Sequence, residues 1–106
     1  MVVQEGKVFK IELDGTPTAG FTWEVTITPE ISRLIELLES TWEHKSEAIG
    51  GMAVQQFRFR AIAPGKITLI FRYRRPWEGT DRDQRAYTVS IEPSDRKDTE
   101  NAFLNH

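Results

Sequence analysis

The chain has 106 residues, of which 39% are hydrophobic and 28% charged, an ordinary composition for one globular domain with a modest core. It contains no cysteine, which excludes disulfide bonds and thiolate metal sites. The formal net charge of -2 gives no overall attraction to nucleic acid or to an anionic membrane. No apolar stretch approaches the roughly 20 residues that cross a bilayer, so no membrane partner is expected.

Two segments in the first quarter of the chain alternate apolar and polar residues with a period of two, which is typical of half-buried strands. Phe9, Ile11 and Leu13 mark the first, over residues 7–13. The second covers residues 21–28 and is rich in β-branched and aromatic residues, which favours a strand, with Trp23 in the core.

The next segment, Glu30 to Glu47, fits two interpretations. Its apolar residues form a helical stripe with good helix formers between them, namely Leu34, Ile35, Leu37, Leu38 and Trp42. Local propensity therefore favours a helix here, although the arrangement of the loops argued below requires a strand near residues 35–43.

Alternation returns in the C-terminal half and predicts three more strands. Two of them flank the turn dipeptide Pro64-Gly65 and form a hairpin; their apolar residues are Phe57, Phe59, Ala61, Ile67, Leu69, Phe71 and Tyr73. The last contains Tyr87, Val89 and Ile91 and is stopped by Pro93, which has no N–H to donate. We expect a domain over residues 1–93 and a flexible, charged tail over residues 94–106.

Three segments between the predicted strands have unusual chemistry: 14–20, 46–53 and 74–84. Each is separated from the next by two strands. Because one strand crosses a sheet and the next returns, loops separated by an even number of strands emerge at the same end. The predicted fold is therefore an all-β, immunoglobulin-like antiparallel β-sandwich with three recognition loops at one end, where function is expected.

These loops resemble the three signature loops of the chagasin family, which are inhibitors of papain-like cysteine peptidases. The residues that carry the resemblance are Thr16-Pro17-Thr18-Ala19-Gly20-Phe21-Thr22-Trp23, then Gly50-Gly51, then Arg75-Pro76-Trp77. The usual family loops are Asn-Pro-Thr-Thr-Gly, Gly-x-Gly-Gly and Arg-Pro-Trp. This chain departs at Thr16, Ala19 and Ala48, which bears on affinity and choice of target more than on the fold.

The resemblance implies that the first loop sits over the catalytic cysteine of the peptidase while the other two flank the cleft. The residues that would contact the peptidase are Thr16, Pro17, Thr18, Ala19, Gly20, Phe21, Ile49, Gly50, Gly51, Arg75, Pro76 and Trp77. Pro17 restricts the backbone and Gly20 permits conformations closed to other residues, so the first loop can be stiff. Trp77, next to Pro76 in a polar segment, has the character of a binding hot spot. The implied inhibition is reversible and 1:1 by a monomer.

Other functions fit less well. An enzyme is disfavoured because there is no cysteine and the only histidines are His44 and His106, so no nucleophile–base pair is evident. A calcium loop at Glu78, Asp81 and Asp83 lacks the ligand spacing, and no metal or cofactor is expected.

Two binding modules are the alternatives to an inhibitor. A β-sheet nucleic-acid binder is suggested by aromatic and basic residues in Phe57-Arg58-Phe59-Arg60 and Phe71-Arg72-Tyr73-Arg74. At a period of two, however, arginines and aromatics point to opposite faces, so bases could not stack on the surface that holds the phosphates. An immunoglobulin-like adhesion module for another protein fits the predicted fold equally well. No secretion signal is evident before Lys7, and the compartment stays open.

Overall fold

The computed structural model describes residues 1–44 and 53–94. Nearly all regular structure in them is strand, as predicted. In chain order the elements are β1 (Val2–Gln4), β2 (Val8–Gly15), η1 (Pro17–Ala19), β3 (Thr22–Val25), α1 (Pro29–Ser32), β4 (Ile35–His44), β5 (Ala53–Ala61), β6 (Gly65–Arg74) and β7 (Asp81–Glu92). Within the described ranges, no helix is long and apolar enough to span a membrane.

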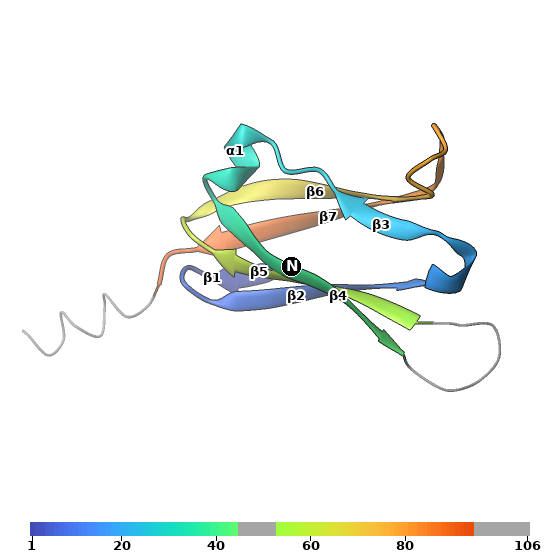
Figure 1. Ribbon diagram of the computed structural model, residues 1–106. Helices are drawn as coiled ribbons and strands as arrows, with labels where there is room; N and C mark the ends of the chain where they lie inside the picture. The colour runs from blue at the N-terminus through green and yellow to red at the C-terminus, as the bar shows by residue number, and fades with distance from the viewer. Residues whose placement is uncertain (45–52, 95–106) are drawn as a thin grey trace, which may run out of the picture.

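The strands form two sheets that pack face to face (Figure 1). One has the order β1-β7-β6-β3 and the other the order β2-β5-β4. All pairs are antiparallel except one: β1 lies parallel to β7, which was not predicted. The two predicted layers are therefore confirmed, while the purely antiparallel pairing is not.

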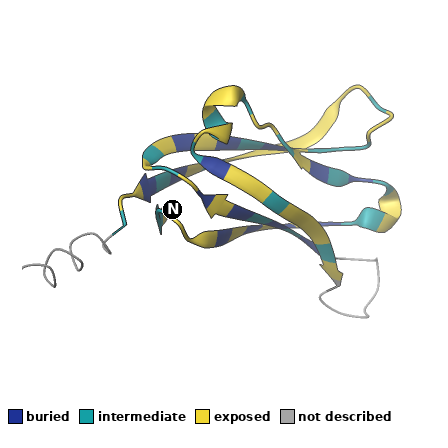
Figure 2. Cartoon of the chain, turned by 60° about the vertical axis from the view of Figure 1, so that its left-hand side comes forward, coloured by how far each residue is buried: buried dark blue, intermediate teal, exposed yellow. Residues whose placement is uncertain are grey.

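The core lies between the sheets and consists of the residues that alternate along the strands (Figure 2). Phe57 of β5 meets Phe71 of β6 edge-on across the two layers, with ring centroids 5.0 Å apart. Trp23 is 3% exposed, which confirms its predicted place in the core. Because Phe57, Phe59 and Phe71 are all buried, their rings are not available to stack on nucleic-acid bases, as the alternation argument anticipated.

The ambiguous segment begins as a helix and continues as a strand. Thr28 caps α1 by accepting a hydrogen bond from the Ile31 N–H at 3.2 Å, and the helix ends after a single turn. From Ile35 the chain pairs with β5, so the helix favoured by local propensity is wrong and the strand required by the loop argument is confirmed. The strand predicted over residues 21–28 is shorter than expected, because α1 begins at Pro29 and regular pairing stops at Val25.

The chain turns at Pro64-Gly65 between β5 and β6 as predicted, but the hairpin expected there is wrong. β5 belongs to the sheet β2-β5-β4 and β6 to the sheet β1-β7-β6-β3, so the turn carries the chain from one sheet to the other. β7 ends at Glu92, directly before Pro93, as expected. The predicted flexible tail lies outside the described residues from position 95 onward.

Candidate functional site

The first and third predicted loops meet at one end of the sandwich. The ends of β4 and β5, which flank the middle loop, lie at the same end. Figure 1 shows the β2–β3 connection, the β6–β7 connection and the adjoining ends of β4 and β5 on the same side. Gly15 at the end of β2 pairs with Ala53 at the start of β5, which in turn pairs with His44. Residues 49–51, the predicted contacts of the middle loop, lie outside the described residues.

The first loop folds as a single turn of 3-10 helix, Pro17–Ala19. Pro17 starts it with the φ that a proline ring imposes, and the turn is closed by hydrogen bonds from Ala19 N–H to Thr16 C=O (3.0 Å) and from Gly20 N–H to Pro17 C=O (2.9 Å). Gly20 ends the turn in the left-handed region, with φ of 88°. The small side chains of Thr18 and Ala19 are exposed at the tip.

Sheet side chains hold the first loop at its start. The Tyr73 hydroxyl accepts a hydrogen bond from the Thr16 N–H at 2.9 Å and lies 3.1 Å from the Thr16 hydroxyl. The Trp23 indole N–H donates to the Asp14 C=O at 3.0 Å. Thr16, where the family has asparagine, is thus engaged within the fold.

Arg75 joins the third loop to the first. Its Nε donates to the Ala19 C=O at 3.0 Å, and its guanidinium forms an ion pair with Glu78 at 3.3 Å. The same guanidinium lies 4.3 Å from the centroid of the Phe21 ring, in cation–π geometry. One side chain therefore ties both loops together.

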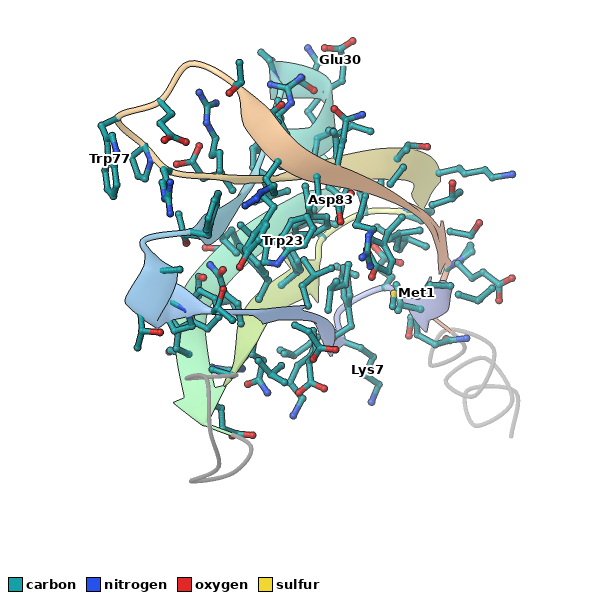
Figure 3. All side chains as sticks on the ribbon, turned by 90° about the vertical axis from the view of Figure 1, so that its right-hand side faces the viewer. Met1, Lys7, Trp23, Glu30, Trp77 and Asp83 are labelled. Carbon is teal, nitrogen blue, oxygen red and sulfur yellow. The ribbon has the colours of Figure 1, made fainter. Side chains whose placement is uncertain are left out.

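Trp77 stands at the tip of the third loop and is 72% exposed, so it is not part of the core. Figure 3 shows its ring projecting from the β6–β7 connection, on the opposite side of the view from Met1. A Cβ added to Gly20 would come within 2.7 Å of the Trp77 Cη2 atom, so the indole lies directly over the glycine backbone. Gly20 is needed both for its positive φ and for this close approach.

Among the predicted contact residues that the structure describes, Phe21 differs from the rest because it is buried, with 8% of its surface exposed. Its ring stacks on Tyr73 with centroids 5.0 Å apart, and Tyr73 in turn packs on Trp23 at 4.7 Å. The structure thus places Phe21 beneath the loops, where it supports them, and leaves Pro76 and Trp77 at the surface.

Three residues of this region were missed from sequence. Gln55 is a polar residue at an inward position of β5, which is a signal for a buried hydrogen-bonding role, and it is 4% exposed. Tyr73 ends the apolar alternation of β6, where an aromatic ring with a hydroxyl can join core and loop. No sequence pattern pointed to Arg82, because the direction of its side chain depends on a β-bulge that appears only when β6 and β7 pair.

The two aspartates considered for calcium form ion pairs with arginines. Asp81 lies 3.6 Å from both Arg72 and Arg74, and Asp83 lies 3.2 Å from Arg85. Across residues 1–44 and 53–94, no group of three or more His, Cys, Asp or Glu side chains could hold a metal ion.

Comparison with known proteins places the chain among peptidase inhibitors. The family model described as Chagasin family peptidase inhibitor I42 matches residues 2–91. Chagasin of Trypanosoma cruzi is 24% identical over 94 residues, covering 86% of each chain. Amoebiasin-1 of Entamoeba histolytica is 28% identical over 91 residues, again with 86% of each chain covered.

Solved structures agree on the fold. The cysteine protease inhibitor EhICP2 from Entamoeba histolytica matches with a TM-score of 0.72 and 22% identity, over 87% of this chain and 85% of that one. The solution structure of amebosin matches with a TM-score of 0.62 and 20% identity, over 89% of this chain and 87% of that one.

Proposed function

The chain belongs to the chagasin family of peptidase inhibitors, and we propose that it inhibits papain-like cysteine peptidases reversibly by filling the active-site cleft with three loops. Members of this family are inhibitors and not enzymes. A relative of the same fold is described as a cysteine protease inhibitor, which supports the class of target. The observation that carries the proposal is the contact of the first and third loops, with Trp77 exposed above Gly20.

The first loop has the properties that a non-cleavable plug requires. Attack on a peptide bond needs near-attack geometry, with the reacting atoms roughly 3 to 3.5 Å apart and correctly aligned. A turn closed by its own hydrogen bonds at Ala19 and Gly20 resists being drawn out into that geometry. The exposed side chains of Thr18 and Ala19 are small enough for a narrow cleft.

The third loop supplies Trp77, the large exposed side chain that would contact the peptidase. An exposed tryptophan at the centre of an interface is typical of residues whose truncation costs about 2 to 4 kcal/mol of binding free energy. Arg75 holds Trp77 beside the first loop through its bond to Ala19, so both loops would dock as one rigid surface. Residues 49–51 would flank the cleft from the other side, as in the family.

Preorganisation makes tight binding possible without a covalent step. Loops that are already ordered lose little conformational entropy on docking. An interface of roughly 1,600 Å² can then reach a nanomolar dissociation constant, about -12 kcal/mol.

The test is a titration of papain and of cathepsin-type peptidases with the protein, followed with a fluorogenic substrate. We expect stoichiometric 1:1 loss of activity, recovery of activity after dilution, and an intact inhibitor by mass spectrometry. Cleavage of the chain during inhibition would contradict the plug mechanism. Full activity of every papain-like enzyme at micromolar inhibitor would refute the proposed target class and favour another protein partner.

A further inference from the structure

Arg82 occupies a special position next to the two loops. In the β6–β7 pairing Tyr73 lies opposite Asp83 and Arg74 lies opposite Asp81, which leaves Arg82 as the extra residue of a β-bulge. Bulges commonly redirect a side chain near a functional site. Here the side chain turns toward the first loop, and its guanidinium carbon lies 4.8 Å from the centroid of the Phe21 ring.

The carboxylates around Arg82 are already paired with other arginines. Glu78 pairs with Arg75, Asp81 with Arg72 and Arg74, and Asp83 with Arg85. Among the residues that the structure describes, Arg82 itself forms no ion pair. It is thus a cation without an internal counterion, at one end of a chain whose net charge is -2.

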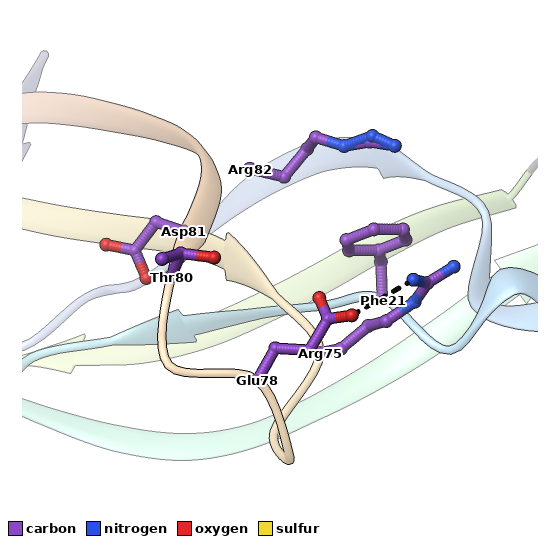
Figure 4. Close-up of a pocket in the computed structure, with 6 residues that line it drawn as sticks. All are labelled: Phe21, Arg75, Glu78, Thr80, Asp81 and Arg82. Atoms are coloured by element: carbon purple, nitrogen blue, oxygen red, sulfur yellow. Dashed lines mark hydrogen bonds and ion pairs between the residues drawn. The ribbon is translucent and has the colours of Figure 1, made fainter.

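The surroundings of Arg82 form an open pocket of about 270 Å³ in the same end of the molecule as Trp77. Figure 4 shows the Phe21 ring with the Arg75 and Arg82 side chains on either side of it, and Glu78, Thr80 and Asp81 complete the lining. Stacking on the ring orients the guanidinium while leaving its N–H groups free. Phe21 also stacks on Tyr73 and contacts Arg75, so it has other supports besides Arg82.

We propose that Arg82 is a specificity residue that binds a carboxylate on the rim of the target peptidase cleft. This inference rests on the proposed inhibitor function. A guanidinium with free donors matches the geometry of a carboxylate, and a charge pair at the rim of an interface acts mainly on the association rate and its salt dependence. Peptidases with an acidic residue at that rim position would be bound in preference to those without one.

The experiment measures association rate constants for the papain-like peptidase that the wild-type chain inhibits most tightly, at several salt concentrations. Arg82→Gln keeps a planar group over Phe21 but removes the charge, and it should lower the association rate constant about 5-fold at low salt with a flatter salt dependence. Arg82→Lys keeps the charge and should retain most of the rate. Arg60→Gln, an equal charge change on β5, is the matched control and should behave as wild type apart from a small effect of net charge.

A double-mutant cycle then identifies the partner. Each carboxylate on the rim of that peptidase is replaced by its amide, and one replacement should abolish the difference between wild type and Arg82→Gln. The inference is overturned if Arg82→Gln and Arg60→Gln have the same rate constants and salt dependence. It is also overturned if Arg82→Lys loses as much as Arg82→Gln together with a lower melting temperature, which would mean that Arg82 only supports Phe21. A wild-type chain that inhibits no papain-like peptidase would refute both proposals, whereas these variant results refute this one alone.

Discussion

The Trp77 ring lies directly over the backbone of Gly20, and this contact fixes how the first and third loops meet. The glycine has a φ of 88° and no side chain, so the indole can lie over its backbone. The indole keeps most of its surface in solvent, where burial against a partner would be favourable by roughly 25 cal/mol per Å² of apolar area. Exposure of so large a ring at a preorganised loop tip is typical of a binding anchor.

Replacing Trp77 by alanine should therefore separate binding from stability. We expect the inhibition constant for a papain-like peptidase to rise roughly 30- to 800-fold, equivalent to about 2 to 4 kcal/mol. The melting temperature should stay within about 3 °C of wild type, because little of the ring is buried in the free protein. Inhibition assays and thermal unfolding measure the two effects.

Ile62 provides the control for Trp77. It is also a large exposed hydrophobic residue, but it lies in the β5–β6 turn at the other end of the sandwich. Ile62→Ala should change neither quantity. A melting temperature of Trp77→Ala lower by 10 °C or more, about 1.5 to 2 kcal/mol for a domain of this size, would show that the ring is part of the scaffold.

At the scale of elements, Gln55 of β5 connects the two sheets next to the site. Its side-chain oxygen accepts a hydrogen bond from the Trp23 N–H at 2.8 Å, and its nitrogen donates to the Trp23 C=O at 3.1 Å. The nitrogen also lies 3.1 Å from the Ser40 hydroxyl of β4. Trp23 is on an edge strand, so the amide satisfies backbone groups that have no neighbouring strand.

Gln55→Leu should lower the free energy of unfolding by about 2 to 3 kcal/mol. The change leaves a buried N–H and a buried C=O of Trp23 without partners, and each unsatisfied group carries a desolvation penalty. The shift of the urea midpoint measures it. Gln56→Leu is the matched control, because the adjacent side chain points the other way and bonds Glu12 at an exposed position; it should cost less than about 0.5 kcal/mol. Equal shifts for both variants would contradict the bridging role of Gln55.

The segment from Pro29 to His44 shows how pairing overrides local preference. Its leucines and glutamates favour a helix, and one turn of helix does form at Pro29–Ser32. Beyond it, pairing with β5 satisfies the backbone and buries Ile35 in the core. A helix over the same residues would leave β5 with a single neighbour and part of the core uncovered.

At the scale of the whole molecule, the scaffold and the site are spatially separate. Leu69 is fully buried in the middle of β6, whereas the candidate contact residues lie at the end of the sandwich. Leu69→Ala should cost about 2 to 5 kcal/mol of stability through lost burial and a residual cavity. At a temperature where the variant is still folded, its inhibition constant should equal that of wild type.

Leu37→Ala serves as the comparison, because Leu37 is 39% exposed on β4 and its truncation should cost less than about 1 kcal/mol. Circular dichroism establishes the folded fraction, and the inhibition constant is referred to that fraction. An inhibition constant that rises for Leu69→Ala in the fully folded protein would show that core packing and loop geometry are coupled.

The sequence by itself indicated β2, β3, β5, β6 and β7 and which of their residues face the core, because alternation with a period of two is a local property of five to eight residues. Counting strands also predicted the first and third loops at one end, but only on the condition that a strand forms near residues 35–43. Only the tertiary structure decided that residues 35–44 are a strand, that β1 joins the sheet in parallel, and that Phe21 is buried. It alone revealed Gln55 as a bridge and Arg82 in a bulge. These outcomes depend on hydrogen bonds and contacts between residues far apart in the chain, which no local pattern specifies.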